Sequence, residues 1–87
     1  MSIADQIHAG LATLVPISVE LIDDSAKHAG HAGAKDGGGH FRLTIVAECF
    51  AGLGTLARHR LVYDALRELM QRDIHALSIT ALTPLEH

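Results

Sequence analysis

The stretch "FRLTIVAEC", residues 41–49, alternates between apolar side chains and polar or small ones along most of its length. Alternation with a period of two places successive side chains on opposite faces of a β-strand. We therefore predict a half-buried strand here. Its inward face would carry Phe41, Leu43, Ile45 and Ala47.

A second alternating stretch, "ISVELID" at residues 17–23, precedes it and places Ile17, Val19 and Leu21 on one face. Two strands with a single connection predict an antiparallel hairpin. The connection, residues 24–40, is far longer than the usual loop of about 2 to 5 residues. It is rich in glycine and histidine and has no large apolar side chain. Long loops of this kind are commonly functional or disordered.

Helices are expected on both sides of the hairpin. A helix over residues 2–14, capped by Ser2 and stopped before Pro16, is indicated by the helical spacing of Ile3, Ile7, Leu11 and Leu14. Gly52 and Gly54 predict a turn and a short helix, and a second, longer helix would start at Arg58. The buried face of the longer helix would be formed by Leu61, Val62, Ala65, Leu66, Leu69 and Met70.

A last strand is predicted at "IHALSITAL", with Leu77, Ile79 and Ala81 on one side. Because helices join it to the preceding strand, the connection is a crossover and the two strands should be parallel. His75, at the start of this strand, should then lie near the histidine-rich loop. Cys49 should lie at the opposite end of the sheet.

The order helix, strand, strand, helix, helix, strand predicts an α/β protein of the two-layer α+β kind, with a three-stranded mixed sheet covered by helices on one face. The 87 residues allow a single domain, residues 1–84. Residues 85–87, "LEH", resemble the remnant of an expression tag and are set aside. We see neither a signal peptide nor a membrane-spanning stretch, and we expect a cytoplasmic protein.

Composition narrows the function further. The net charge of −3 argues against a general binder of phosphate backbones. The single cysteine, Cys49, excludes an internal disulfide and a cysteine-only metal site, and it is expected to be inert within an apolar strand.

Ser25 and its neighbours lie in a loop that offers no rigidly oriented base, so we do not expect an enzyme.

Histidine is abundant, with seven in 87 residues, and three of them, His28, His31 and His40, share the long loop. Imidazole binds zinc, copper, nickel and iron near neutral pH. The plainer alternative is that the loop histidines are solvated and that His75 is a partly buried edge residue. A closed zinc site would need four ligands, whereas a site completed by a second protein, or a metal site in the loop alone, stays open.

Three stretches, "VELIDDSAKH", "HFRLTIVAECFAGLGTLARHRLVYDALRELM" and "IHALSITALTP", resemble the BolA family over residues 17–84. The most specific part is "HAL" at His75 together with the pattern formed by Phe50, Gly52, Arg58, His59, Arg60, Val62, Tyr63 and Leu66. The resemblance implies a KH-like fold with the element order given above.

BolA-like proteins partner monothiol glutaredoxins and share with them a bridged [2Fe–2S] cluster that glutathione also ligates. The resemblance implies His75 as one ligand from this chain. Through "DDSAKH" it implies His28 as the other, with His31 as the alternative. No cluster would be held by the isolated chain, which we expect to be monomeric and away from membranes.

The family also includes members described as transcriptional regulators, so DNA is a second possible partner. Arg58, His59 and Arg60 are the candidate surface for a partner protein or nucleic acid. However, the spacing of Arg60 with Asp64, and of Glu68 with Arg72, predicts ion pairs within a solvated helix face. The turn "GLGT" lacks the spacing of the GXXG loop with which KH domains clamp nucleic acid.

Overall fold

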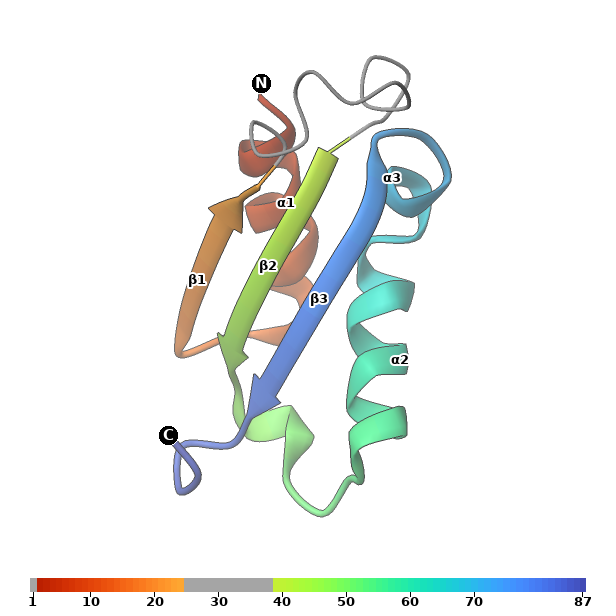
Figure 1. Ribbon diagram of the computed structural model, residues 1–87. Helices are drawn as coiled ribbons and strands as arrows, with labels where there is room; N and C mark the ends of the chain where they lie inside the picture. Colours follow the sequence, from red (N-terminus) through yellow and green to blue (C-terminus); the bar gives the residue numbers. More distant parts are fainter. Residues whose placement is uncertain (1, 25–38) are drawn as a thin grey trace.

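The computed structural model describes residues 2–24 and 39–87 (Figure 1). His28 and His31, both predicted as ligands, lie outside the described residues. The chain forms, in order, α1 (Ile3–Leu11), the 3₁₀ turn η1 (Ala12–Leu14), β1 (Ser18–Asp23), β2 (Gly39–Val46), the 3₁₀ turn η3 (Glu48–Phe50), α2 (Thr55–Ala65), α3 (Arg67–Arg72) and β3 (Ile74–Leu82).

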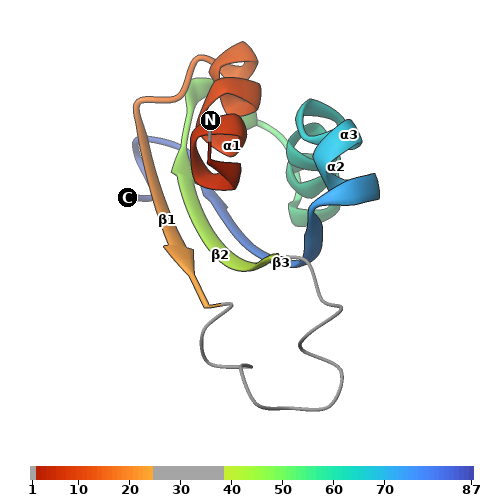
Figure 2. The same ribbon diagram turned by 90° about the horizontal axis from the view of Figure 1, so that it is seen from above.

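The sheet has the strand order β1-β2-β3. β1 is antiparallel to β2, and β3 is parallel to β2, as the crossover through the helices requires. Seen from above, α1, α2 and α3 gather on one side of the curved sheet (Figure 2). The predicted two-layer α+β architecture with a mixed three-stranded sheet is therefore confirmed.

The core lies between the sheet and the helices. The predicted inward face of the central strand is correct, since its four side chains are at most 4% exposed. They pack with residues of the helices and turns in one cluster that includes Ile7, Leu11, Phe50, Val62, Leu66 and Leu69. Ile17 is the exception to the predicted pattern, because it precedes β1 and is 59% exposed.

The first helix follows the prediction closely. Ser2 accepts a hydrogen bond from the backbone N–H of Asp5, whose carboxylate in turn accepts one from the N–H of Ser2. This reciprocal capping satisfies N–H groups that have no partner inside the helix. The α-helix ends at Leu11, and the 3₁₀ turn η1 continues the coil to Leu14 before Pro16.

The predicted division of the second helical region is wrong. α2 runs without interruption past Arg58, so the longer helix comes first and the break falls at Leu66. Leu66 has left the helical conformation (φ −109°, ψ 18°) and is 1% exposed. Its burial against α1 shows that tertiary packing, rather than local helix propensity, sets the position of this break.

Gly10 is where α1 approaches that break. A Cβ atom at Gly10 would lie 2.9 Å from Cδ2 of Leu66 and 3.1 Å from the carbonyl oxygen of Ala65. Both distances are shorter than ordinary van der Waals contact, and one of the two atoms belongs to the backbone. The close approach of the two helical segments therefore depends on the missing side chain.

We predict that Gly10→Leu lowers the free energy of unfolding by about 1–3 kcal/mol, because the new side chain must push the helices apart. Urea denaturation followed by circular dichroism measures the change. Ala9→Leu, at the exposed neighbouring position of α1, is the matched control. Equal denaturation midpoints for the two variants would contradict the prediction.

Candidate functional site

Two histidines meet where β2 and β3 begin. The ring centroids of His40 and His75 are 5.1 Å apart, with their planes tilted by 43°. His75 is exposed and His40 is half-buried. The prediction that parallel pairing brings His75 to the histidine-bearing end of the sheet is thus met by His40.

The start of the central strand differs from the prediction. The predicted long loop includes His40, but β2 already begins at Gly39. β3 begins at Ile74, the first residue of the predicted stretch "IHALSITAL", and Gly39 is aligned with Ile74.

An irregularity in the pairing of β2 with β3 sets the position of His75. Gly39 is aligned with Ile74 and His40 with Ala76, so His75 is the extra residue on β3. A bulge of this kind redirects the side chain of the extra residue and is frequent beside functional sites. It lets the imidazole of His75 lie beside that of His40.

Gly39 fixes the start of β2. A Cβ atom there would fall only 1.9 Å from Cε2 of Phe41, so the ring of Phe41 occupies the space of a side chain. The N–H of Gly39 donates to the carbonyl of Asp73 over 2.7 Å, and the N–H of Asp24 donates to the carbonyl of His40 over 2.7 Å. The backbone beneath His40 is therefore held from both neighbouring segments.

A carboxylate and a guanidinium border the histidine pair. Arg42 donates from Nε to Oδ2 of Asp24 over 2.6 Å and from Nη2 to Oδ1 over 3.4 Å. Beside them is a shallow hollow of about 290 Å³, lined by Asp24, His40, Phe41, Arg42, Ala76, Leu77 and Ser78. Among the described residues, the histidine pair is thus bordered by both an ion pair and a hollow.

The described residues do not complete a metal site. No group of three or more His, Cys, Asp or Glu side chains within residues 2–24 and 39–87 is placed to hold a metal ion. His40 and His75 could supply two imidazole nitrogens, a donor set that suits iron. Any further ligands would have to come from outside the described residues or from another molecule.

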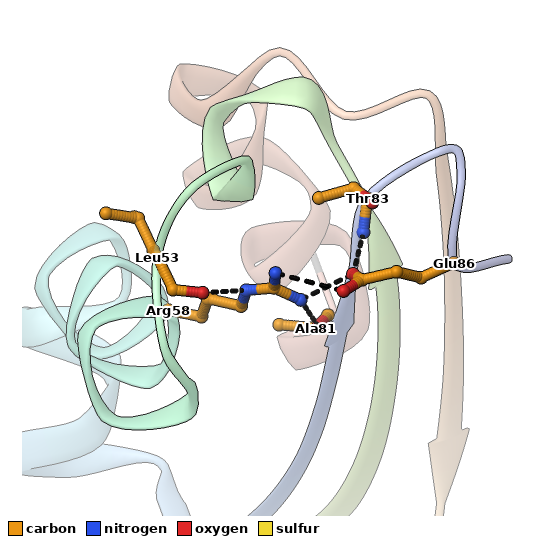
Figure 3. A network of polar contacts seen from close by, with 5 residues as sticks. All are labelled: Leu53, Arg58, Ala81, Thr83 and Glu86. Atoms are coloured by element: carbon orange, nitrogen blue, oxygen red, sulfur yellow. Dashed lines mark hydrogen bonds and ion pairs between the residues drawn. The ribbon is translucent and has the colours of Figure 1, made fainter.

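Arg58, one of the three residues of the predicted partner surface, is only partly exposed. Its side chain is 13% exposed and points into a network at the other end of β3 (Figure 3). Nε donates to the carbonyl of Leu53 over 2.8 Å, and Nη1 donates to the carbonyl of Ala81 over 3.0 Å. Of the predicted surface, Arg60 is exposed and His59 is half-buried.

Glu86 completes the network. Its Oε1 accepts from Nη1 of Arg58 over 2.6 Å and from the N–H of Thr83 over 2.8 Å, while Oε2 accepts from Nη2 of Arg58 over 3.2 Å. Glu86 lies in the segment that sequence reasoning set aside as a tag remnant. The origin of that segment stays a prediction, but its side chain is part of the folded structure.

Cys49 is exposed and lies in η3, not in an apolar strand as predicted. β2 ends at Val46, where its pairing with both neighbouring strands stops. Val46 is the last residue of β2 paired with β1, opposite Ser18, and the last paired with β3, opposite Leu82.

The ion pairs on the helices also differ from the prediction. Among the described residues, Asp64 pairs with Arg67 and Arg72 pairs with Asp73, each over 3.7 Å. The break at Leu66 starts a new helix at Arg67, next to the end of α2, and Arg72 is the last residue of that short helix. Exposed pairs of this kind add little to stability.

No helix in the described part of the chain is long and apolar enough to span a membrane.

The fold and the site define a class: a small two-layer α+β protein with paired histidines where two parallel strands begin. Among solved structures, BolA1 from Arabidopsis thaliana superposes with a TM-score of 0.85 at 40% identity, covering 100% of this chain and 97% of that one. The family model described as BolA-like protein matches residues 11–86. The chain belongs to the BolA family.

Two curated relatives show how varied this family is. The "SufE-like protein 1, chloroplastic/mitochondrial" of Arabidopsis thaliana is 45% identical over 78 residues, which are 84% of this chain and 21% of that protein. The "DNA-binding transcriptional regulator BolA" of Escherichia coli (strain K12) is 33% identical over 84 residues, which are 95% of this chain and 77% of that protein. The chain spans 21% to 50% of the length of the first curated relatives that it matches.

We predict that Gly39→Ala lowers the free energy of unfolding by about 1–3 kcal/mol, because Phe41 must leave its position in the core. The imidazole resonances of His40 and His75 should shift in the same variant. Chemical denaturation and nuclear magnetic resonance measure the two effects. Gly54→Ala is the control, since nothing lies within 4 Å of a Cβ there; a Gly39→Ala protein that matches it would refute the prediction.

A second prediction concerns acid. The hydrogen bonds from Arg58, followed by that from the Thr83 backbone, lower the pKa of Glu86 from 4.5 to about 2. A depressed pKa in the folded state means that the stabilisation is complete above pH 4.5 and disappears as the pH falls toward 2. Glu86→Gln should therefore denature at lower urea than the wild type at pH 7, and the difference should shrink between pH 4.5 and 2. Glu48→Gln, at an exposed position, controls for the lost charge; a difference independent of pH would contradict this account.

Proposed function

We propose that this chain is a non-enzymatic partner of a monothiol glutaredoxin and shares with it, and with glutathione, a bridging [2Fe–2S] cluster in iron–sulphur trafficking or iron-linked regulation. The observation that carries the proposal is the pair of histidine rings 5.1 Å apart where β2 and β3 begin. The family resemblance supplies the identity of the partner and of the cluster.

The ligands proposed from this chain are His75 and a histidine of the long loop, His28 or, as the alternative, His31. His40 joins them as a candidate because its ring lies beside that of His75. The two imidazoles where β2 and β3 begin would leave coordination positions for a second molecule to fill. Histidine ligation in place of cysteine raises the reduction potential of such a cluster.

The fixed backbone at this end supports the proposal. Gly39 and Asp24 tie the start of β2 to the segments on either side, so His40 and His75 sit on strands rather than on a free loop. A ligand that is positioned before the partner arrives loses less conformational entropy when the complex forms. The exposed imidazole of His75 is accessible to that partner.

The test mixes the protein with a monothiol glutaredoxin, iron, sulfide and glutathione, and records visible absorption and circular dichroism. The wild type should give a spectrum that glutaredoxin alone does not give. His75→Ala should abolish it, and one of His28→Ala, His31→Ala and His40→Ala should alter it. His8→Ala, at an exposed position of α1, is the control and should behave as the wild type. A wild-type mixture indistinguishable from glutaredoxin alone would rule the proposal out.

A KH-like nucleic-acid-binding transcriptional regulator is the second candidate. It is favoured by the name of the Escherichia coli relative, which is 33% identical to this chain. It is disfavoured by the net charge of −3 and by the inward position of Arg58. If this second function is correct, the affinity of the protein for DNA should fall as salt is added and should also fall in Arg60→Ala.

A further inference from the structure

Arg58 has two hydrogen-bond acceptors in the packed domain besides Glu86. The backbone carbonyls of Leu53 and Ala81 accept hydrogen bonds from Nε and Nη1, and the side chain is 13% exposed. These acceptors belong to the turn before α2 and to β3, two parts of the packed domain. The guanidinium is therefore fixed in orientation, with its outer edge facing the C-terminal segment (Figure 3).

The position filled by the Glu86 carboxylate has the features of an anion site. Two guanidinium nitrogens and the backbone N–H of Thr83 converge on the two oxygens, at 2.6, 3.2 and 2.8 Å. A planar guanidinium with two parallel N–H groups matches a carboxylate in shape as well as in charge. The lowered pKa of Glu86 shows that these donors favour the ionised form.

The segment that carries Glu86 is otherwise weakly attached. All four residues 84–87 are exposed, and Leu85 is fully so. The hydrogen bond from the N–H of Glu86 to the carbonyl of Thr83 closes a local turn and does not tie the segment to the core. The positioned guanidinium of Arg58 thus faces the carboxylate of Glu86. The segment that carries Glu86 can move away while losing little buried surface.

We propose that Arg58 and the N–H of Thr83 form a carboxylate-binding site, which Glu86 fills from within the chain and which a carboxylate of a protein partner fills when Glu86 moves out. This inference does not depend on the proposed cluster function.

Space for such a partner adjoins the site. A hollow of about 320 Å³ is lined by Thr55, Arg58, His59, Ile79, Thr80, Ala81 and Leu82. Leu56, the next residue of α2, is 68% exposed. Apolar and hydroxyl groups around a single guanidinium suit an acidic side chain or chain end with small apolar neighbours. Arg58 is the only arginine or lysine among the residues lining the hollow, whereas a phosphate backbone would call for several cations.

The experiment titrates isotope-labelled full-length chain with short peptides and follows the Arg58 Nε–H and Thr83 N–H resonances. The probes are a peptide blocked at both ends with one internal Glu, its Gln counterpart, a peptide whose only carboxylate is its C-terminus, and inorganic phosphate. The proteins are the wild type, Glu86→Gln, and Glu86→Gln combined with Arg58→Lys. Glu48→Gln is the matched control for loss of a carboxylate elsewhere.

Glu86→Gln should bind a carboxylate peptide about tenfold or more tightly than the wild type, because the internal carboxylate no longer competes at high effective concentration. Shifts should centre on Arg58 and Thr83, and Arg58→Lys should remove them. Preference for the internal Glu or for the C-terminus identifies the source of the carboxylate. The proposal is overturned if Glu86→Gln binds neither carboxylate peptide, binds the Gln peptide equally well, or responds to phosphate alone. If the double variant does not fold, the affinities of the Glu86→Gln protein for the Glu peptide and for the Gln peptide are compared instead. Equal affinities would overturn the proposal.

Discussion

The parallel pairing of β2 with β3 is the constraint on which the rest of this structure depends. It exists because α2 and α3 carry the chain back to the end of the sheet where β2 began. One consequence is that His40 and His75, far apart in the sequence, start adjacent strands and bring their rings together. The other is that both strands finish together, at Val46 and Leu82, where the network of Arg58 forms.

The absent side chain of Gly39 makes that pairing possible at its first residue. The ring of Phe41 occupies the space that a Cβ atom at Gly39 would need, and it is buried in the core next to the site. The same glycine begins the irregular register that leaves His75 as the extra residue of β3. Packing of the core and orientation of a candidate ligand are therefore linked through one position, and a substitution there cannot change only one of them.

Sequence patterns predicted the parts of the fold that depend on local periodicity. The inward face of β2 and the start of α1 followed from side-chain spacing and a capping serine. The break at Leu66 could not be predicted, because it depends on how closely Gly10 lets α1 approach. The inward turn of Arg58 has no local signal either, since its acceptors are two backbone carbonyls and a carboxylate 28 residues away. Parallel pairing predicted that His75 lies near the loop histidines, and the resemblance implied its role as a ligand. That the ring of His40 lies beside it depends on the irregular register and on the start of β2 at Gly39.

The two ends of β3 are separated by the length of the strand, from Ile74 to Leu82. At about 3.3 Å per residue this is roughly 25 Å, well beyond the distance at which substitutions usually influence each other's energetics. The histidine end and the Arg58 end can therefore be altered independently by mutation. A single partner that used both would have to follow β3, which among the described residues pairs with β2 alone and so forms an edge of the sheet. At that edge the guanidinium of Arg58 already occupies the carbonyl of Ala81, so a partner strand could pair only with the part of β3 nearer His75.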